Sequence, residues 1–452
     1  MKIVLVGAAS AQFGLGMLGD FFQSEKLYGS EIVLVDINAT GLKSVQEKAD
    51  RFLAANPLPF TVWSTTDRAQ ALKECDAVVI AIEVGDRFAL WSEDWTVAQQ
   101  WGIKQIYGEN GGPGGLFHAL RITPPILEIC ADVARFSPNA WVFNFSNPMT
   151  AITTTVKRAF PELNFVGLCH EVASLERYLP LILDTPFENL VLRSGGLNHF
   201  SVLLSAHYRD SGLDAYPDIL AKAPAFFEIE PGYSDILAHY KARGVLPRTE
   251  GATNRSNLGI DRSAKKWADR TLFRRFLETY KLLPITGDSH IGEYIQWAWQ
   301  VADHKGIKDF FELYPAMLSR ERPTIELKQE ERLVLILEGL MSSEPYEEPA
   351  VNILNSNLIA DLPSSIAVEV PAMISKDGIV GVPLTDYPKG FLALLRNYCG
   401  VYDLTAEAIL TGKKEYVIQA LLANPIVDIH DGLDELVDLM IERQIRWLGY
   451  LQ

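Results

Sequence analysis

The chain has 452 residues, with 41 Lys or Arg against 57 Asp or Glu, so its formal net charge is −16. Hydrophobic residues make up 48% of the sequence and charged residues 22%, which excludes intrinsic disorder and predicts two or three globular domains. The acidic excess argues against nucleic acid and anionic membranes as partners, because both are bound through clustered Lys and Arg.

Cysteine usage and apolar runs indicate the compartment. The four cysteines are too few and too scattered for a disulfide framework, so we expect a reduced, cytoplasmic enzyme. The first apolar run, Ile3–Val6, is shorter than the apolar region of a signal peptide. No stretch approaches the roughly 18 consecutive apolar residues of a membrane span, so no membrane segment is predicted.

Short apolar strands alternate with helices along the first 150 residues. Strands are predicted at Ile3–Val6, Ile32–Val35, Ala77–Ile82 and Ala140–Phe145. A helix is predicted over Ala39–Ala54, where apolar residues recur at helical spacing. Apolar strands separated by helices are typical of a parallel sheet, so the predicted fold class is α/β with an N-terminal Rossmann-type doubly wound sheet.

Beyond about residue 200 this alternation fades. Helical patterns cover Ala264–Leu283 and Leu433–Leu451. A Pro- and Gly-rich loop region is predicted at Tyr216–Gly259, and an irregular stretch at Val351–Val382. These features predict a C-terminal, mixed α+β portion that packs on the first one.

The loop after the first strand has the position of a dinucleotide-binding turn, where Gly allows a tight turn and helix amides hold the pyrophosphate. The G-x-G-x-x-G spacing keeps Gly7, while Ala9 and Gln12 replace the other two glycines. Asp36 ends the second strand, where an acid accepts both ribose hydroxyls and repels the 2′-phosphate of NADP. We therefore predict NAD, held by Gly7, Ala8, Ser10, Gln12, Phe13 and Asp36.

Six further motifs follow in order along the chain. They are Tyr107–Gly115, Phe145–Pro148, Gly167–Val172, Gly196–Phe200, Gly287–Tyr294 and Val368–Pro371. Together they resemble glycoside hydrolase family 4, the NAD- and Mn-dependent glycosidases. The resemblance implies an organisation like that of lactate and malate dehydrogenases. Residues 1–197 would form an NAD-binding Rossmann-like domain, and 198–452 an α+β domain for substrate, metal and oligomerisation.

Cys169 and His199 are the candidate metal ligands. A thiolate and a neutral imidazole can bind a borderline divalent metal, although a lone Cys or His is more often a core residue. The resemblance decides between these interpretations, because the two positions match the Mn²⁺ pair of the family. Two protein ligands leave coordination sites open for substrate hydroxyls.

Other site residues follow from the same resemblance. Asn147 lies between a strand end and Pro148, so it is either a turn residue or, as the family implies, a ligand of substrate hydroxyls. Glu109 matches the position that supports the catalytic base. Asn110 and Arg121 are candidates for neighbouring contacts.

The resemblance also implies the reaction. Bound NAD⁺ removes hydride from C3 of the sugar, which acidifies the C2 proton, and Mn²⁺ polarises the C2 and C3 oxygens. A base removes that proton, an acid assists departure of the aglycone, water adds and hydride returns. This family is therefore an exception to the two-carboxylate scheme of most glycosidases.

The base and the acid are assigned by position. Asp288 is the first candidate for the base, Tyr294 the second and Tyr240 a distant third. His290 is a candidate for substrate binding or proton transfer. His170, directly after the metal cysteine, matches the acid of α-acting members.

The sugar is predicted from two positions. Leu90 stands where phospho-glycosidases have an Arg for the 6-phosphate, which favours a non-phosphorylated α-glycoside. The tetrad Cys169–Val172 resembles the α-galacturonidase subgroup, and Arg87 could pair with a uronate. α-Galacturonidase is therefore the leading prediction. The alternatives are α-glucosidase, α-galactosidase and α-glucuronidase, or a different class, a 2-hydroxyacid-type NAD-dependent dehydrogenase or a non-catalytic sensor.

Family members usually self-associate, so a homodimer or homotetramer is expected. The apolar stripe of the last predicted helix suits either the core or a dimer face. It consists of Leu433, Leu436, Leu439 and Met440.

Overall fold

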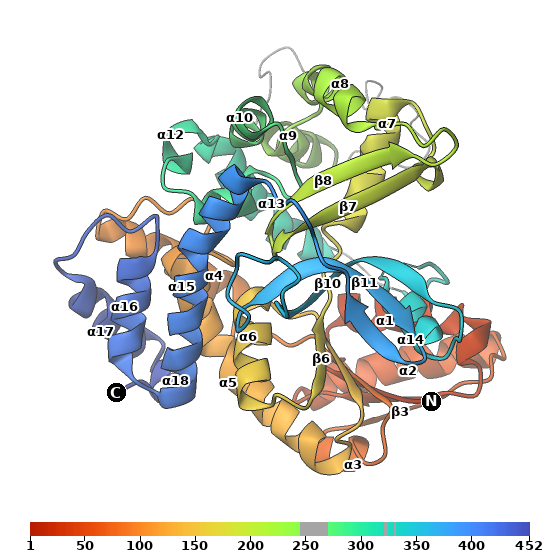
Figure 1. Cartoon of the computed structure of the whole chain (residues 1–452). Coiled ribbons are helices and arrows are strands. Elements are labelled where there is room, and N and C mark those ends of the chain that lie inside the picture. Colours follow the sequence, from red (N-terminus) through yellow and green to blue (C-terminus); the bar gives the residue numbers. More distant parts are fainter. Residues whose placement is uncertain (245–269, 321–323, 330) are drawn as a thin grey trace.

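A twelve-stranded sheet, in the order β3-β2-β1-β4-β5-β6-β10-β11-β7-β8-β9 with β12 beside β11, forms the centre of the molecule. The computed structural model describes residues 1–244, 270–320, 324–329 and 331–452 (Figure 1). The α/β class is as predicted. None of the helices in these ranges is long and apolar enough to cross a membrane.

The first six strands are parallel, in the strand order 3-2-1-4-5-6 of a dinucleotide-binding sheet. Their bounds are β1 Lys2–Val6, β2 Glu31–Val35, β3 Thr61–Thr65, β4 Ala77–Ile80, β5 Trp141–Asn144 and β6 Asn164–Gly167. Four of them confirm the predicted strands. The sequence analysis missed β3, an edge strand with little burial, and β6, which is only four residues long.

Helices cover both faces of this parallel half. They are α1 Ala11–Phe22, α2 Ala39–Ala55, α3 Arg68–Ala71, α5 Gly112–Phe136 and α6 Met149–Ala159. Two further helices of this region, α4 Arg87–Gln100, which packs on α5, and α7 Leu179–Leu183, which belongs to a separate core, do not cover the strands. Ile3 and Leu5 face the core formed with α1 and α2, whereas Val4 and Val6 face the core formed with α5 and α6. Successive residues of a strand point to opposite faces, so strands buried on both faces are apolar throughout.

The remaining strands continue the sheet in antiparallel pairing. They are β7 Leu190–Leu197, β8 Phe200–Tyr208, β9 Leu283–Pro284, β10 Tyr346–Leu354, β11 Ala367–Ser375 and β12 Gly378–Gly381. Asn352 of β10 pairs with Gly167 of β6, and Glu369 of β11 pairs with Gly196 of β7. The domain boundary predicted after residue 197 lies between β7 and β8 and stays a prediction.

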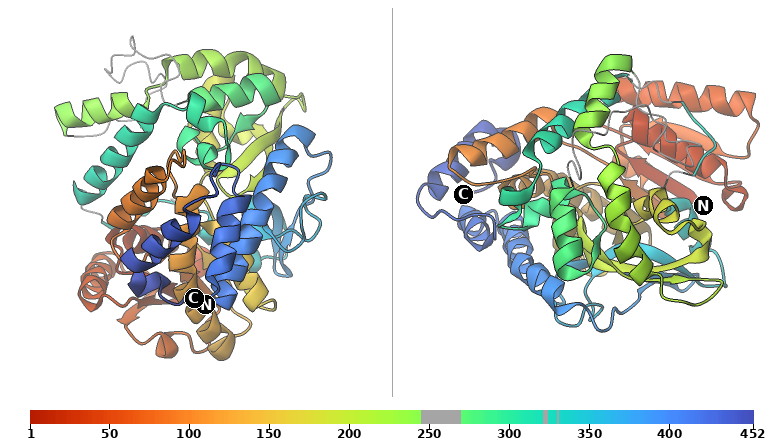
Figure 2. Two further views of the ribbon diagram at one scale, coloured as in Figure 1. Left: turned by 90° about the vertical axis from the view of Figure 1, so that its left-hand side faces the viewer. Right: turned by 90° about the horizontal axis from the view of Figure 1, so that it is seen from above.

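The later helices pack on both halves of the molecule. They are α8 Tyr216–Ile229, α9 Tyr233–Arg243, α10 Thr271–Tyr280, α11 Asp288–Ile291, α12 Ala298–Val301, α13 His304–Arg320, α14 Leu333–Leu340, α15 Lys389–Thr411, α16 Lys414–Ala423, α17 Leu433–Arg443 and α18 Ile445–Leu448. Figures 1 and 2 show α15–α18, in blue, on the side of the molecule opposite the N-terminal layer, in red.

Two predictions for the second half were wrong. The expected loop at Tyr216–Gly259 contains α8 and α9. Pro217 does not prevent α8 from forming, because it lies in the first turn, where the backbone N–H makes no hydrogen bond within the helix. Residues 245–259 lie outside the described residues. The expected irregular stretch at Val351–Val382 contains most of β10 and all of β11 and β12. Its strands lack polar alternation because β11 is buried on both faces.

The two predicted C-terminal helical patterns are shorter in the structure. Within Ala264–Leu283 the helix α10 is formed, and residues 264–269 lie outside the described residues. The pattern Leu433–Leu451 divides into α17 and α18 at Gln444. The stripe on α17 packs in a core with α5 and α16, with Leu439 only partly buried, and self-association stays a prediction.

Candidate active site

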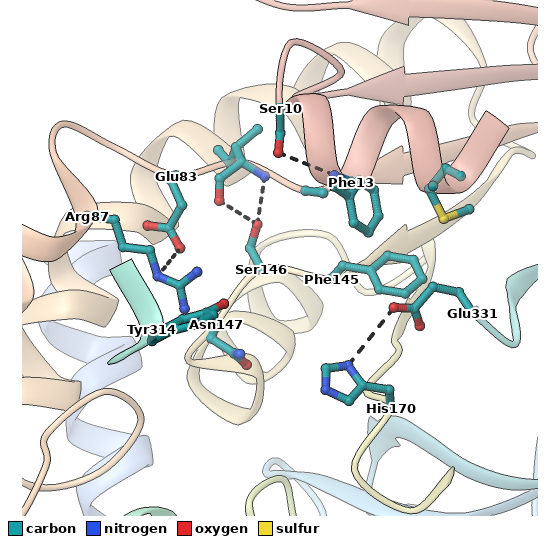
Figure 3. Close-up of a pocket in the computed structure, with 14 residues that line it drawn as sticks. Ser10, Phe13, Glu83, Arg87, Phe145, Ser146, Asn147, His170, Tyr314 and Glu331 are labelled. Atoms are coloured by element: carbon teal, nitrogen blue, oxygen red, sulfur yellow. Dashed lines mark hydrogen bonds and ion pairs between the residues drawn. The ribbon is translucent and has the colours of Figure 1, made fainter. Parts of the chain in front are cut away.

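A cavity of about 360 Å³ opens at the carboxyl ends of β1, β4 and β5 (Figure 3). Open α/β sheets bind their ligands at this edge. The chain segments that follow these strands supply most of the wall, and α13 and the segment before α14 close it. The polar and aromatic wall residues are Ser10, Phe13, Glu83, Arg87, Phe145, Ser146, Asn147, His170, Tyr314 and Glu331.

The predicted dinucleotide loop has a backbone that requires glycine. Gly7 has φ +97°, and a Cβ there would lie 2.1 Å from the carbonyl oxygen of Ala81. Ser10 caps α1, its hydroxyl accepting a hydrogen bond from the Phe13 amide at 3.4 Å. Asp36 accepts from the amide of Ala9 at 2.9 Å, so the acid at the tip of β2 is fixed beside the loop.

The structure thus brings five of the six predicted NAD residues to one place. Ala8 is buried under the turn, and Ser10 and Phe13 line the cavity. The side chain of Gln12 lies outside the described part of the chain.

The predicted metal pair is brought together across 30 residues of sequence. Cys169 Sγ lies 3.4 Å from His199 Nε2, and the side-chain amide of Asn110 lies 2.8 Å from Nδ1 of the same ring. Oδ1 of Asn110 has no other partner, so an amide turned to accept the Nδ1 proton leaves Nε2 with its lone pair towards the thiol. This donor set fits a borderline divalent metal.

Burial governs the ionisation of both donors. It lowers the pKa of His199 well below its usual value, and His290 and His170 act in the same direction, which keeps the imidazole neutral as a ligand must be. Burial, Glu171 and Glu369 raise the pKa of the Cys169 thiol well above normal. A bound cation acts against that shift, because a coordinated thiol loses its proton.

The described residues offer this pair and no larger cluster. Across residues 1–244, 270–320, 324–329 and 331–452, no three His, Cys, Asp or Glu side chains are grouped so that they could hold a metal.

A histidine and two carboxylates lie behind the pair. The ring of His290 is 4.4 Å from that of His199, and its Nδ1 is 3.4 Å from Glu293 and 3.9 Å from Glu109. Burial alone would lower the pKa of His290, but Glu293 and Glu109 raise it to about 9. Glu293 also accepts from the amides of Asn110 and Gly111, so it holds the glycine-rich loop in place.

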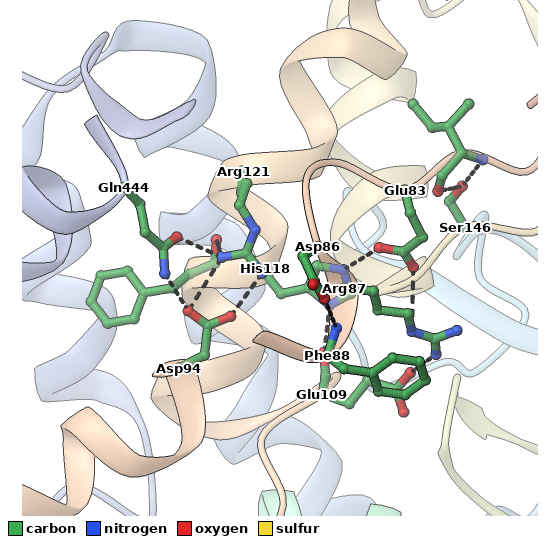
Figure 4. Close-up of polar contacts among 12 residues, drawn as sticks. Glu83, Asp86, Arg87, Phe88, Asp94, Glu109, His118, Arg121, Ser146 and Gln444 are labelled. Atoms are coloured by element: carbon green, nitrogen blue, oxygen red, sulfur yellow. Dashed lines mark hydrogen bonds and ion pairs between the residues drawn. The ribbon is translucent and has the colours of Figure 1, made fainter. Parts of the chain in front are cut away.

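Two arginines on α4 and α5 pair with carboxylates, as Figure 4 shows. Arg87 lies 2.6 Å from Glu109 and lines the cavity. Arg121 lies 2.7 Å from Asp94, and both are almost fully buried beside Gln444. Arg121, predicted as a neighbouring contact of the site, is therefore committed to an internal ion pair.

The three candidates for the base do not line the cavity. Asp288 is fully buried and accepts hydrogen bonds from the first amides of α10, Leu272 and Phe273, at 2.8 Å each. Tyr294 stacks on Phe200 in the core, with its ring centroid 4.6 Å away. Tyr240 donates to the carbonyl oxygen of Ala316 at 3.0 Å, between α9 and α13.

Asn147 and His170 do face the cavity. Asn147 follows β5, and its buried Oδ1 has no hydrogen-bond partner among the residues that the structure describes, so it can accept from a ligand. His170 is 61% exposed and lies 4.0 Å from Glu331. Both positions agree with contact to a small molecule in this space (Figure 3).

Sequence models of the two parts of one family match nearly the whole chain. "Family 4 glycosyl hydrolase" matches residues 2–185, and "Family 4 glycosyl hydrolase C-terminal domain" matches residues 194–427. The chain belongs to glycoside hydrolase family 4. The resemblance seen in the motifs is thereby confirmed, and membership favours a glycosidase over the dehydrogenase that the N-terminal half alone would allow.

Individual relatives refine this family membership. The glycosidase is 58% identical over 451 residues to an α-glucosidase from Erwinia rhapontici, covering 100% of this chain and 99% of that protein. It is 25% identical over 451 residues to an α-galacturonidase from Bacillus subtilis, covering 95% and 94%. The predicted α-galacturonidase activity is not confirmed, whereas the α-glucosidase alternative fits the first relative.

A solved structure shows the same fold. The 6-phospho-β-glucosidase from Thermotoga maritima, with manganese, NAD⁺ and glucose-6-phosphate, has a TM-score of 0.76 to this glycosidase at 18% identity, covering 99% of both chains.

Five polar or aromatic side chains of the cavity wall were given no role from the sequence: Glu83, Phe145, Ser146, Tyr314 and Glu331, although Phe145 and Ser146 belong to one of the family motifs. Glu83 follows the end of β4 by three residues, and the rule that ligands bind at the carboxyl ends of strands could have found it. Tyr314 lies on α13 and Glu331 in the segment before α14, neither within a motif, so nothing in the sequence pointed to them.

Proposed function

We propose that the protein is an α-glucosidase that hydrolyses a non-phosphorylated α-glucoside with the help of NAD and a divalent metal. The observation that carries this proposal is the 58% identity, along the full length, to the α-glucosidase of Erwinia rhapontici. The geometry supports it, since Arg87, the cation expected to bind a uronate, already lies 2.6 Å from Glu109.

The residues that would hold the cofactors belong to two groups, the loop after β1 with Asp36, and the pair Cys169 and His199. Gly7, Ser10 and the N-terminus of α1 would hold the pyrophosphate, and Asp36 the ribose. Cys169 and His199 would hold the metal. When bound, the dinucleotide would take and return a hydride at the sugar, and the metal would polarise the neighbouring hydroxyl oxygens.

The chain's own side chains would orient the sugar and move protons. Asn147 accepts a hydrogen bond from a sugar hydroxyl through Oδ1, which has no partner among the described residues. His170, at the exposed side of the cavity, donates a proton to the leaving oxygen. Glu109 and Glu293 raise the pKa of His290, which lies behind the metal pair. Asp288 caps α10 and has no part in this scheme.

A substrate panel tests the proposal. Nitrophenyl α-glucoside, α-galactoside, α-galacturonide and α-glucuronide are compared with NAD⁺, Mn²⁺ and a thiol reductant present. We expect the glucoside to give the highest kcat/KM, with turnover that leaves no net NADH. Preference for a uronide would overturn the proposed sugar, and NADH formed in proportion to product would overturn the glycosidase itself.

A further inference from the structure

We propose that Glu83 determines the specificity for uncharged sugars, by occupying the cavity side of Arg87 and by accepting a hydrogen bond from a sugar hydroxyl. This inference rests on the proposed function and names a specificity residue within it. Glu83 is three residues past the end of β4 and lines the main cavity. It also lines a smaller cavity beside Glu109 and His118.

The contacts of Glu83 hold its carboxylate without using up its lone pairs. Oε1 lies 3.7 Å from Arg87 Nε, and Oε2 lies 3.8 Å from His118 Nε2. Both distances exceed that of a hydrogen bond, and Arg87 Nε has no hydrogen-bond partner within the described part of the chain. With 35% of its side chain exposed, Glu83 can therefore accept hydrogen bonds from a ligand in the cavity.

Carboxylates and aromatic rings surround much of the Arg87 guanidinium, although 30% of the side chain stays exposed. Nη2 lies 2.6 Å from Glu109, and the group lies 5.5 Å from the ring centre of Tyr314 and 5.9 Å from that of Trp91. Two carboxylates and three aromatic rings, including that of Phe88 at 5.8 Å, thus lie around one cation. A ligand carboxylate or phosphate that approached Arg87 from the cavity would also come near the exposed carboxylate of Glu83.

The charges that face Glu83 keep it ionised. Burial raises its pKa, but His118 and Arg87 outweigh burial, so the pKa lies below the usual value. Among the described residues that line the cavity, Arg87 is the one permanent cation, against Glu83 and Glu331. A carboxylate repels anionic ligands and accepts from neutral hydroxyls, so the wall selects against sugars with a charged C6 group.

The experiment uses two substrates that differ at C6 alone, nitrophenyl α-glucoside and nitrophenyl α-glucuronide. In Glu83→Gln we expect the ratio of kcat/KM for the glucoside over the glucuronide to fall at least about tenfold relative to the unmodified enzyme, which is about 1.4 kcal/mol. Glu83→Asp keeps the charge, so we expect a ratio within about threefold of the unmodified enzyme.

Glu331→Gln is the matched control, because it removes one carboxylate from the same cavity at a distance from Arg87 (Figure 3). We expect it to leave the ratio unchanged. Where turnover of a variant is too slow, inhibition constants for glucose and glucuronate give the same ratio.

An unchanged ratio in Glu83→Gln, or an equal change in Glu331→Gln, would overturn the inference. The substrate preference of the unmodified enzyme tests the proposed function separately, because the inference concerns only the change between enzyme and variant.

Discussion

Arg121 and Arg87 meet carboxylates in different surroundings, although both lie on the neighbouring helices α5 and α4 (Figure 4). The side chains of Arg121 and Asp94 are 4% and 1% exposed and share hydrogen bonds with Gln444 near the C-terminus. The side chain of Arg87 is 30% exposed and borders the cavity. The same ion-pair chemistry therefore fastens the C-terminal helices in one place and shapes a ligand site in the other.

Breaking the buried pair of Arg121 and Asp94 should have the largest effect on stability. Arg121→Ala leaves Asp94 buried without its cation, and we expect the free energy of unfolding to fall by about 3–5 kcal/mol. Urea unfolding measures this, and kcat of the folded fraction should stay within about threefold, because Arg121 does not face the cavity. The double variant Arg121→Met with Asp94→Leu should recover much of the lost free energy of unfolding. An unchanged stability in Arg121→Ala would contradict the view that this pair holds the fold together.

Breaking the pair of Arg87 and Glu109 should lower kcat instead. Glu109→Gln weakens the hold on Arg87 and His290, and we expect kcat to fall about 100-fold, as for the loss of a group that supports proton transfer. The midpoint of urea unfolding should change little, since Glu83 remains beside Arg87. A variant with normal kcat and a large loss of stability would show that Glu109, like Asp94, stabilises the fold and does not support the reaction.

Asp288 extends the comparison to a buried acid that is held by backbone amides and, among the described residues, forms no ion pair. Burial raises its pKa from 3.8 to about 7, against the lowering effect of the Leu272 and Phe273 amides. The folded state then binds the proton more tightly than the unfolded state, so its contribution to stability is complete below about pH 4 and lost as the pH rises through about 7.

Asp288→Asn should remove this loss. We expect the unmodified enzyme to lose about 2 kcal/mol between pH 5 and 7 relative to the variant, measured by urea unfolding across that range. The variant should keep its glycosidase activity, since Asp288 caps α10. Abolished activity in a stably folded Asp288→Asn would restore Asp288 as the base.

Local backbone chemistry explains which parts of the site the sequence could predict. Gly7 and Asp36 follow from a turn and a strand end, both within one supersecondary unit, and the structure places them together. Cys169 and His199 were found through the family motifs and lie 3.4 Å apart. In contrast, the role of Asp288 depends on α10, whose first amides are 15 and 16 residues upstream, and no spacing rule predicts such a cap.

The same reasoning applies to the fold. The parallel half was predictable because short apolar strands and amphipathic helices alternate along the chain. β11 was missed because a strand that is buried on both faces lacks the polar alternation that marks an exposed sheet, and β10 because its pairing is interrupted between Glu348 and Val351. Glu83, Tyr314 and Glu331 meet only when three separate segments fold against one cavity.

Hydrolysis of the α-glucoside in D₂O tests the central claim most directly. If the enzyme removes and later restores the C2 proton, the released glucose carries deuterium at C2, and no NADH accumulates. Mass spectrometry and NMR of the product detect this label. Glucose with C2 deuterium would agree with the NAD-assisted elimination, whereas glucose formed at the same rate without deuterium at C2 would contradict it.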